Sequence, residues 1–254
     1  MVRVHVIQLG YGDGESPADR TRRVAALVRA QQGADLVVLP ELWPQGGFSY
    51  DRWEHDAEPI DGPVVEAMRA AARDVGAILH MGSLVERDEA GRLFNTSVLI
   101  GPDGATLTTY RKVHLFGFGE GEPKLMSAGD GVAVHERLGL ATCYDLRFPE
   151  QFRLLLDAGA EVVLLVAAWP AKRVAHWRLL AQARAVENQS YVVACNTAGT
   201  HAGVPMGGGS VVVGPWGTVL AEAGDDEEVL VVDLDLELVG ATRAQFPVLA
   251  DRRL

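Results

Sequence analysis

The chain has 254 residues, of which 48% are hydrophobic and 22% are charged, a balance typical of a globular protein with a substantial core. Its formal net charge is −11, which argues against nucleic acid or an anionic membrane as the main partner, because both bind basic surfaces. A small anionic substrate stays compatible with this charge, since a single Arg or Lys in a pocket can bind a carboxylate.

The beginning of the chain, Met1 to Leu9, is too short and too alternating to be a signal peptide. No apolar run in the sequence reaches the length needed to cross a membrane. The only two cysteines are Cys143 and Cys195, so no disulfide framework is predicted. We therefore expect a cytoplasmic protein, in a reducing compartment where a lone thiol stays available as a nucleophile.

The first half of the chain alternates predicted strands and helices. Residues 2–9 place alternate valines on one face, as a strand does. Ser16 is a predicted N-cap, and Pro17 then occupies the first position of a helix that we expect to stop at Gly33. Residues 36–39 form a continuous apolar run, typical of a strand that is buried on both faces.

The same pattern continues to the end of the chain. Pro63 starts a second predicted helix, and Gly76 ends it. Further helices are predicted at 149–158 and 173–188, and strands at 77–84, 94–100, 105–110, 138–142, 162–168, 191–196, 210–214 and 229–234. The glycine run at 207–209 lacks a following Lys-Ser or Lys-Thr, so it is not a predicted phosphate loop. The simplest interpretation is one layered α/β domain over residues 1–254.

Three reactive side chains follow predicted strands, where α/β proteins collect functional groups. Glu41 closes the apolar strand that ends at Pro40, and Lys112 follows the strand at 105–110. Cys143 ends the strand at 138–142 and begins a turn into a helix. Such a junction presents a side chain to a cleft, and we expect the helix N-terminus and a nearby Lys to favour the thiolate.

A thiol, an ammonium and a carboxylate are sufficient for acyl transfer through a thioester. Attack of the Cys143 sulfur on an amide carbonyl creates an oxyanion, which Lys112 and a backbone N–H can stabilise; loss of one such donor typically costs about 100- to 1,000-fold in rate. Glu41 can exchange protons with the leaving amine and with water. Each residue alone also has a structural interpretation, as a turn carboxylate, a solvated lysine or a buried small side chain.

The order of these segments resembles that of the nitrilase superfamily of carbon–nitrogen hydrolases. The glutamate motif is matched by Pro40-Glu41, the lysine motif by Tyr110-Arg111-Lys112-Val113-His114-Leu115-Phe116, and the cysteine motif by Cys143-Tyr144-Asp145-Leu146-Arg147-Phe148-Pro149-Glu150. The likeness continues through His176-Trp177, residues 183–188, Asn196-Thr197-Ala198-Gly199 and Gly214-Pro215-Trp216-Gly217, to Arg243 and Phe246-Pro247. The resemblance therefore spans nearly the whole chain.

The resemblance implies a four-layer α-β-β-α sandwich and a Glu-Lys-Cys catalytic triad. It also implies a second glutamate that orients the lysine; Glu122 matches that position best, and Glu120 is its competitor. The oxyanion would lie between Lys112 and the backbone N–H of Tyr144. We interpret Asn95 as a structural residue and Cys195 as part of the core.

The cysteine motif resembles the amidase branch that includes omega-amidases and deaminated-glutathione amidases. We therefore expect a small amide substrate, with the terminal amide of a dicarboxylic acid monoamide as the candidate. Arg173 is the candidate partner for the substrate carboxylate, and Trp169 and Tyr144 are candidate pocket walls. An N-carbamoyl amino acid hydrolase or a nitrilase is the alternative, although the Trp-Glu pair that usually follows a nitrilase's cysteine is absent.

Neither a metal nor an organic cofactor is implied, because the seven histidines form no cluster with the spacing of metal ligands. Members of the family commonly form homodimers, so we expect at least a dimer, formed through the helices after Cys143 and Trp169. A different class of function stays open at this level: a catalytically idle protein that uses the hydrolase fold as a binding module.

Overall fold

The fold is described by a computed structural model that covers residues 1–253 and contains two six-stranded sheets. The first sheet has the strand order β15 (Glu228–Leu234), β1 (Val2–Gln8), β3 (Leu36–Val38), β4 (Ile78–Arg87), β5 (Leu93–Ile100) and β6 (Thr106–Arg111). The second has the order β14 (Val219–Glu222), β13 (Val211–Val213), β10 (Tyr191–Cys195), β9 (Val162–Val166), β8 (Leu138–Thr142) and β7 (Ala133–His135). In each sheet the central strands are parallel: β1, β3 and β4 in the first, β8, β9 and β10 in the second.

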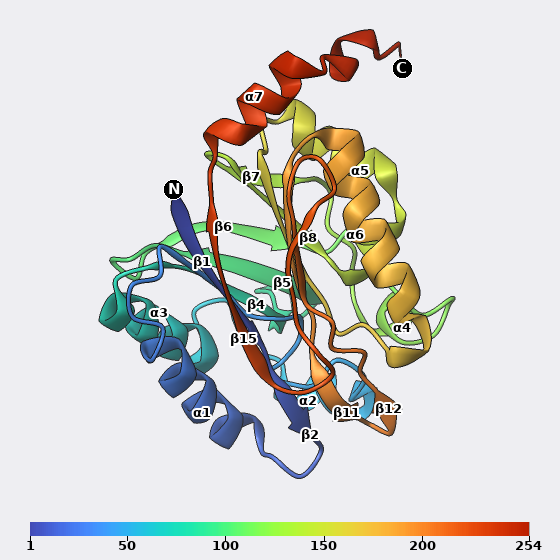
Figure 1. Cartoon of the computed structure of the whole chain (residues 1–254). Coiled ribbons are helices and arrows are strands. Elements are labelled where there is room, and N and C mark those ends of the chain that lie inside the picture. The colour runs from blue at the N-terminus through green and yellow to red at the C-terminus, as the bar shows by residue number, and fades with distance from the viewer. Residues whose placement is uncertain (254) are drawn as a thin grey trace.

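Helices cover the outer face of each sheet (Figure 1). Helices α1 (Pro17–Arg29) and α3 (Pro63–Val75) pack on the first sheet, and α5 (Pro149–Asp157) and α6 (Val174–Asn188) pack on the second. The inner faces of the two sheets share one apolar core, in which residues such as Val38 and Leu99 meet Leu164 and Val193. The predicted four-layer α-β-β-α sandwich is therefore confirmed.

Shorter elements surround this framework. A third sheet, visible at the lower end of Figure 1, joins β2 (Gly10–Gly12), β11 (Ala198–His201) and β12 (Val204–Pro205). The remaining helices are α2 (Tyr50–Asp56), α4 (Glu122–Leu125) and α7 (Glu237–Gln245), with 3₁₀ turns at Cys143–Arg147, Ala171–Arg173 and Val248–Asp251. No helix within residues 1–253 is long and apolar enough to cross a membrane.

Local signals set most of the helix ends where the sequence predicts them. The Ser16 side chain accepts a hydrogen bond from the Asp19 N–H at 3.1 Å and caps α1. Gly76 ends α3 in a left-handed conformation with φ of +70°. The predicted end of α1 at Gly33 is wrong: the helix stops at Arg29, and Gly33, with φ of +81°, lies in the turn that follows.

Candidate active site

Glu41 lies just beyond the end of β3 and is 2% exposed. Its Oε1 accepts hydrogen bonds from Lys112 Nζ and Asn95 Nδ2, both at 2.8 Å, and its Oε2 accepts one from the Ala168 N–H at 2.8 Å. Gly82 of β4 passes directly below this segment with φ of +72°, and a Cβ there would lie 1.8 Å from the Pro40 oxygen. Only glycine fits at this approach, which fixes the position of the loop that carries Glu41.

Lys112 directly follows β6 and is 1% exposed. Its backbone N–H donates to the Asn95 oxygen at 2.9 Å, and its own carbonyl accepts from the Gly129 N–H at 2.9 Å. Its ammonium lies between two carboxylates, at 2.8 Å from Glu41 Oε1 and at 2.8 Å from Glu122 Oε2. Burial alone would lower the pKa of Lys112, but the charges of Glu122 and Glu41 outweigh it and raise the pKa well above its usual value.

Glu122 begins the short helix α4 and is also buried. Its Oε2 accepts a hydrogen bond from the Phe116 N–H at 2.6 Å. Burial raises the pKa of Glu122, while the Lys112 ammonium acts in the opposite direction. Glu120 is exposed and pairs with Lys124 at 3.0 Å. Of the two candidates for a second glutamate, only Glu122 thus contacts Lys112.

Asn95, interpreted from the sequence as structural, lies in the same cluster. Its Nδ2 donates to Glu41 Oε1 at 2.8 Å and to Glu122 Oε1 at 2.7 Å. Sequence reasoning missed this contact, and the available signal was the pairing of two predicted strands. Asn95 and Lys112 are opposite one another across β5 and β6, one step beyond the pair Thr96 and Arg111.

Cys143 starts the 3₁₀ turn after β8, with φ of +47°. Buried Asp145 holds this turn, because its carboxylate accepts from the Thr142 N–H at 2.9 Å and from the Tyr110 hydroxyl at 2.7 Å. The same carboxylate accepts from the His114 N–H at 3.1 Å. Asp145 therefore ties the turn of the thiol to the segment that follows Lys112.

The thiol of Cys143 is not poised as a thiolate, contrary to our expectation from the sequence. Burial raises the pKa of Cys143 well above its usual value, and the nearby Glu41 carboxylate raises it further. The Lys112 charge acts in the opposite direction without reversing the shift. In the resting protein the sulfur keeps its proton, so a base is needed to remove it.

Cys143 opens into a narrow cavity of about 20 Å³. The residues lining it include all three predicted substrate contacts, Tyr144, Trp169 and Arg173, together with Phe48, Phe116, Arg147, Ala168 and Pro170. The Arg173 guanidinium lies over the Phe116 ring at 5.2 Å, and that of Arg147 over the Trp169 ring at 4.8 Å. Among residues 1–253 neither guanidinium has a carboxylate partner, so two cationic groups face the cavity beside the thiol.

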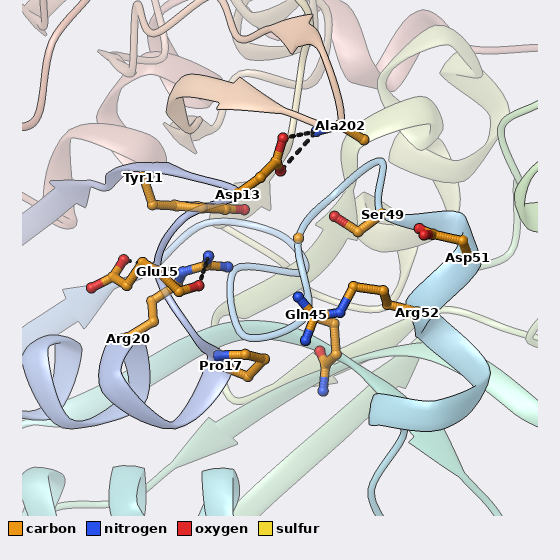
Figure 2. A pocket seen from close by; sticks show the side chains of 11 residues that line it. Tyr11, Asp13, Glu15, Pro17, Arg20, Gln45, Ser49, Asp51, Arg52 and Ala202 are labelled. Carbon is orange, nitrogen blue, oxygen red and sulfur yellow. Dashed lines mark hydrogen bonds and ion pairs between the residues drawn. The ribbon is translucent and has the colours of Figure 1, made fainter.

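A second cavity, of about 200 Å³, is lined by Tyr11, Asp13, Arg20, Ser49, Arg52 and their neighbours (Figure 2). None of the predicted site residues lines it. Buried Arg20 instead donates to the Trp43 carbonyl at 2.9 Å and so supports the loop that follows Glu41.

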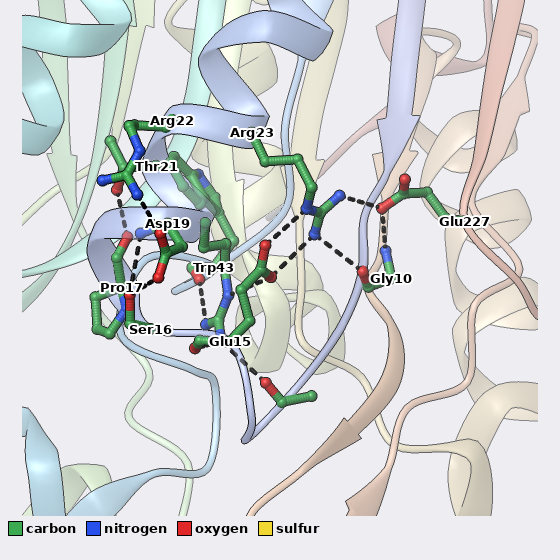
Figure 3. A network of polar contacts seen from close by, with 12 residues as sticks. Gly10, Glu15, Ser16, Pro17, Asp19, Thr21, Arg22, Arg23, Trp43 and Glu227 are labelled. Atoms are coloured by element: carbon green, nitrogen blue, oxygen red, sulfur yellow. Dashed lines mark hydrogen bonds and ion pairs between the residues drawn. The ribbon is translucent and has the colours of Figure 1, made fainter.

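A network around the start of α1 supports the same region (Figure 3). Arg23 contacts Glu15 at 2.8 Å and Glu227 at 2.8 Å, and donates to the Gly10 carbonyl at 3.1 Å. Glu227 also accepts from the Gly10 N–H at 3.0 Å. These contacts join α1 to β2 and to the turn before β15. They stabilise the fold and involve none of the predicted site residues.

The second cysteine, Cys195, belongs to the core and not to the cluster of Glu41, Lys112 and Cys143. Cys195 is confirmed as a core residue: it lies between the sheets, fully buried, with its Sγ 3.3 Å from the Ile7 oxygen. Within the described residues, 1–253, no group of three His, Cys, Asp or Glu side chains is arranged to hold a metal ion.

Comparison with known proteins gives matches along nearly the whole chain. The family model described as carbon-nitrogen hydrolase matches residues 3–244. The 2-oxoglutaramate amidase of Paenarthrobacter nicotinovorans is 42% identical over 98% of this chain and 89% of its own length. The omega-amidase NIT2 of Homo sapiens is 36% identical over 99% of this chain and 95% of its own length.

Solved structures also resemble this fold over nearly the whole length of the chain. XC1258 of Xanthomonas campestris, a CN-hydrolase superfamily protein with an arsenic adduct in its active site, superposes with a TM-score of 0.91 at 32% identity, over 100% of this chain and 97% of that one. The E41Q mutant of an amidase of Nesterenkonia sp. AN1, in which acrylamide has added to the active-site cysteine, superposes with a TM-score of 0.83 at 28% identity, over 98% of this chain and 99% of that one.

The raised pKa of Cys143 predicts how its alkylation depends on pH. Because the thiol is protonated at neutral pH, its rate of reaction with iodoacetamide will rise about tenfold per pH unit from about pH 7 to about pH 9. Cys195 will stay unlabelled in the folded protein because it is fully buried. Peptide mass spectrometry measures both rates, and a Cys195→Ala variant is the control. A rate that is already constant below about pH 7 would mean a resting thiolate.

Proposed function

The chain belongs to the carbon–nitrogen hydrolase family, and we propose that it releases ammonia from the terminal amide of a small dicarboxylic acid monoamide, with Cys143 as the nucleophile. That the protein is an enzyme acting on amides follows from its relatives and argues against the idle binding module. The observation that carries the finer proposal is the cluster of Glu41, Lys112, Glu122 and Cys143 beside a cavity with two arginines that have no carboxylate partner among residues 1–253.

In the first half of the proposed reaction, Glu41 accepts the Cys143 proton and the sulfur attacks the amide carbon. The carbonyl oxygen becomes an oxyanion, held by the Lys112 ammonium and the Tyr144 N–H. When the tetrahedral intermediate collapses, the C–N bond breaks and Glu41 returns its proton to the departing ammonia. The acyl group then remains on sulfur as a thioester.

In the second half, Glu41 accepts a proton from water and the hydroxide attacks the thioester carbon. The Lys112 ammonium and the Tyr144 N–H again stabilise the oxyanion that forms. Collapse breaks the C–S bond, releases the carboxylic acid and returns the proton to sulfur. Glu122 serves by keeping Lys112 charged and oriented, a role that its 2.8 and 2.9 Å contacts with the ammonium support.

The two cavity arginines support a substrate that carries a carboxylate. The protein as a whole has a formal net charge of −11, so a guanidinium that lies beside the nucleophile's cavity without a carboxylate partner in the described part of the chain is a local exception. Arg173 is the proposed fork for the substrate carboxylate, with Trp169 and Tyr144 as cavity walls. The 2-oxoglutaramate amidase among the relatives acts, by its name, on a substrate of this class.

We further propose a homodimer formed through α5 and α6. These helices expose large apolar side chains to solvent, with Leu154 57% exposed and Leu179 66% exposed, and neighbouring Trp216 is 47% exposed. Sedimentation velocity measures the assembly.

For the compartment we propose a reducing cytoplasm, because both cysteines are free thiols. Fractionation of cells followed by immunoblotting tests this.

Ammonia release tests the reaction. The panel consists of succinamate, 2-oxoglutaramate, deaminated glutathione, simple aliphatic amides, N-carbamoyl amino acids and a nitrile. We expect the dicarboxylic monoamides to be the best substrates, and Cys143→Ala to lower the rate at least about 1,000-fold because the covalent route is lost. Cys195→Ala, the matched control, will keep the wild-type rate. Undiminished release by Cys143→Ala would refute the nucleophile, and a preference for the N-carbamoyl compounds or the nitrile would assign another branch.

Substitution of Arg173 tests the carboxylate fork. Arg173→Met keeps an unbranched apolar stem and removes the guanidinium, so kcat/KM for succinamate will fall about 10- to 100-fold, mainly through KM, because a charged hydrogen bond to the substrate is lost. The rate on a neutral aliphatic amide will change little. Arg178→Met is the control, since Arg178 lies on α6 and pairs with Glu222 outside the cavity. Equal losses on both amides would show that Arg173 does not recognise the carboxylate.

A further inference from the structure

Asn95 lies at the point where the two site carboxylates come together. Its Nδ2 donates one hydrogen bond to Glu41 Oε1 at 2.8 Å and one to Glu122 Oε1 at 2.7 Å. Lys112 Nζ donates to the same two oxygens, at 2.8 and 2.9 Å. Each of these oxygens therefore accepts from one amide and one ammonium, and the carboxylates are bridged twice.

The backbone fixes this amide in place. Asn95 lies in β5, paired with Val85 of β4 on one side and bonded to the Lys112 N–H on the other, and it is 1% exposed. A side chain held between two strands has little freedom to follow a moving partner. The bridge is therefore part of the sheet rather than of a loop.

The Asn95 amide is oriented so that its Nδ2 donates to both carboxylates, which leaves its Oδ1 without a hydrogen bond in the described part of the chain. Asn95 Oδ1 is buried and has no hydrogen-bond partner within residues 1–253. The flipped amide would aim Oδ1 at the oxygens of Glu41 and Glu122, an acceptor against two acceptors. An unsatisfied buried oxygen is costly, so its presence here indicates that both N–H groups are needed where they are.

The charges around Asn95 explain that need. Two carboxylates and one ammonium leave an excess negative charge in a site shielded from water, which favours uptake of a proton by one carboxylate. The other titratable groups facing the cluster are Cys143, Tyr50 and Tyr11. Burial raises the pKa of each of them, that of Tyr50 to about 12, so that all three are neutral near pH 7. Donors that bind a carboxylate favour its ionised form, and Asn95 supplies two of them.

We propose that Asn95 is a positioning residue for the reaction: its side-chain amide holds Glu41 and Glu122 together in their ionised forms, so that Glu41 is free to accept the Cys143 proton. This inference rests on the proposed function, in which Glu41 is the general base. Asn95 makes no hydrogen bond to the sulfur and does not line the cavity beside it, so it acts through the two carboxylates.

Profiles of kcat and kcat/KM against pH test the role of the amide in Asn95→Ala and in the isosteric Asn95→Asp. In Asn95→Ala the acid limb will move upward by about one to two pH units, the equivalent of a lost hydrogen bond to a charged group. The fall will be in kcat rather than in KM. Asn95→Asp adds a third carboxyl group to the cluster, so at pH 7 it will be less active than Asn95→Ala.

A residue that only filled space would give the opposite order, because Asp preserves the shape of Asn and Ala leaves a void. Asn188→Ala is the matched control: this buried amide lies at the end of α6 and donates to the Arg184 carbonyl at 2.9 Å, so its loss will lower the melting temperature without moving the acid limb. A thermal melt shows whether Asn95→Ala folds. If it does not fold, the activity of Asn95→Asp at pH 7 relative to the wild type tests the inference by itself.

Two results would overturn the inference: an acid limb that stays in place in folded Asn95→Ala, or an Asn95→Asp variant as active as the wild type at pH 7. Cys143→Ala is assayed in parallel, so that a failure of the proposed function can be distinguished from a failure of the role given to Asn95. Activity that survives in Cys143→Ala contradicts the proposed function itself. An inactive Cys143→Ala beside an unshifted Asn95→Ala contradicts only the role given to Asn95.

Discussion

A single ammonium buried between two carboxylates is the interaction on which the site depends. Lys112 is 1% exposed, and an ion removed from water in this way costs several kcal/mol unless its partners are held in good geometry. Glu41 and Glu122 supply those partners at 2.8 Å each. Removal of Lys112 would leave two buried carboxylates without a compensating charge, at a cost of about 3–5 kcal/mol. The three side chains therefore have to be placed together by the fold.

The sandwich places them from segments that are distant in sequence. Glu41 follows β3 and Lys112 follows β6 in one sheet, while Cys143 follows β8 in the other. Tight backbone contacts make these placements rigid: a Cβ at Gly82 would collide with the Pro40 oxygen at 1.8 Å, and one at Gly129 with the Arg111 oxygen at 2.1 Å. The site is thus built on strand ends, and the substrate cavity beside it is narrow.

The sequence is sufficient to identify some parts of this arrangement and not others. Glu41, Lys112 and Cys143 could be proposed because each closes a strand within a recognisable motif. The contact of Asn95 with both carboxylates depends on the register of β5 against β6, which periodicity does not fix. The expectation of a thiolate at Cys143 was wrong because burial and the Glu41 charge depend on three-dimensional packing. Elements such as α4, with four residues, are too short to have a detectable period.

The proposed reaction requires the acyl group to pass through a thioester on Cys143, and trapping with hydroxylamine detects this intermediate. The amide of a dicarboxylic acid and the ester with the same acyl group are each hydrolysed in the presence of hydroxylamine, and the ratio of hydroxamate to free acid is measured. A common thioester predicts one ratio for both substrates, since the leaving group has already departed, and no hydroxamate from Cys143→Ala. The absence of hydroxamate from the wild type, or a ratio that changes with the leaving group, would contradict the claim.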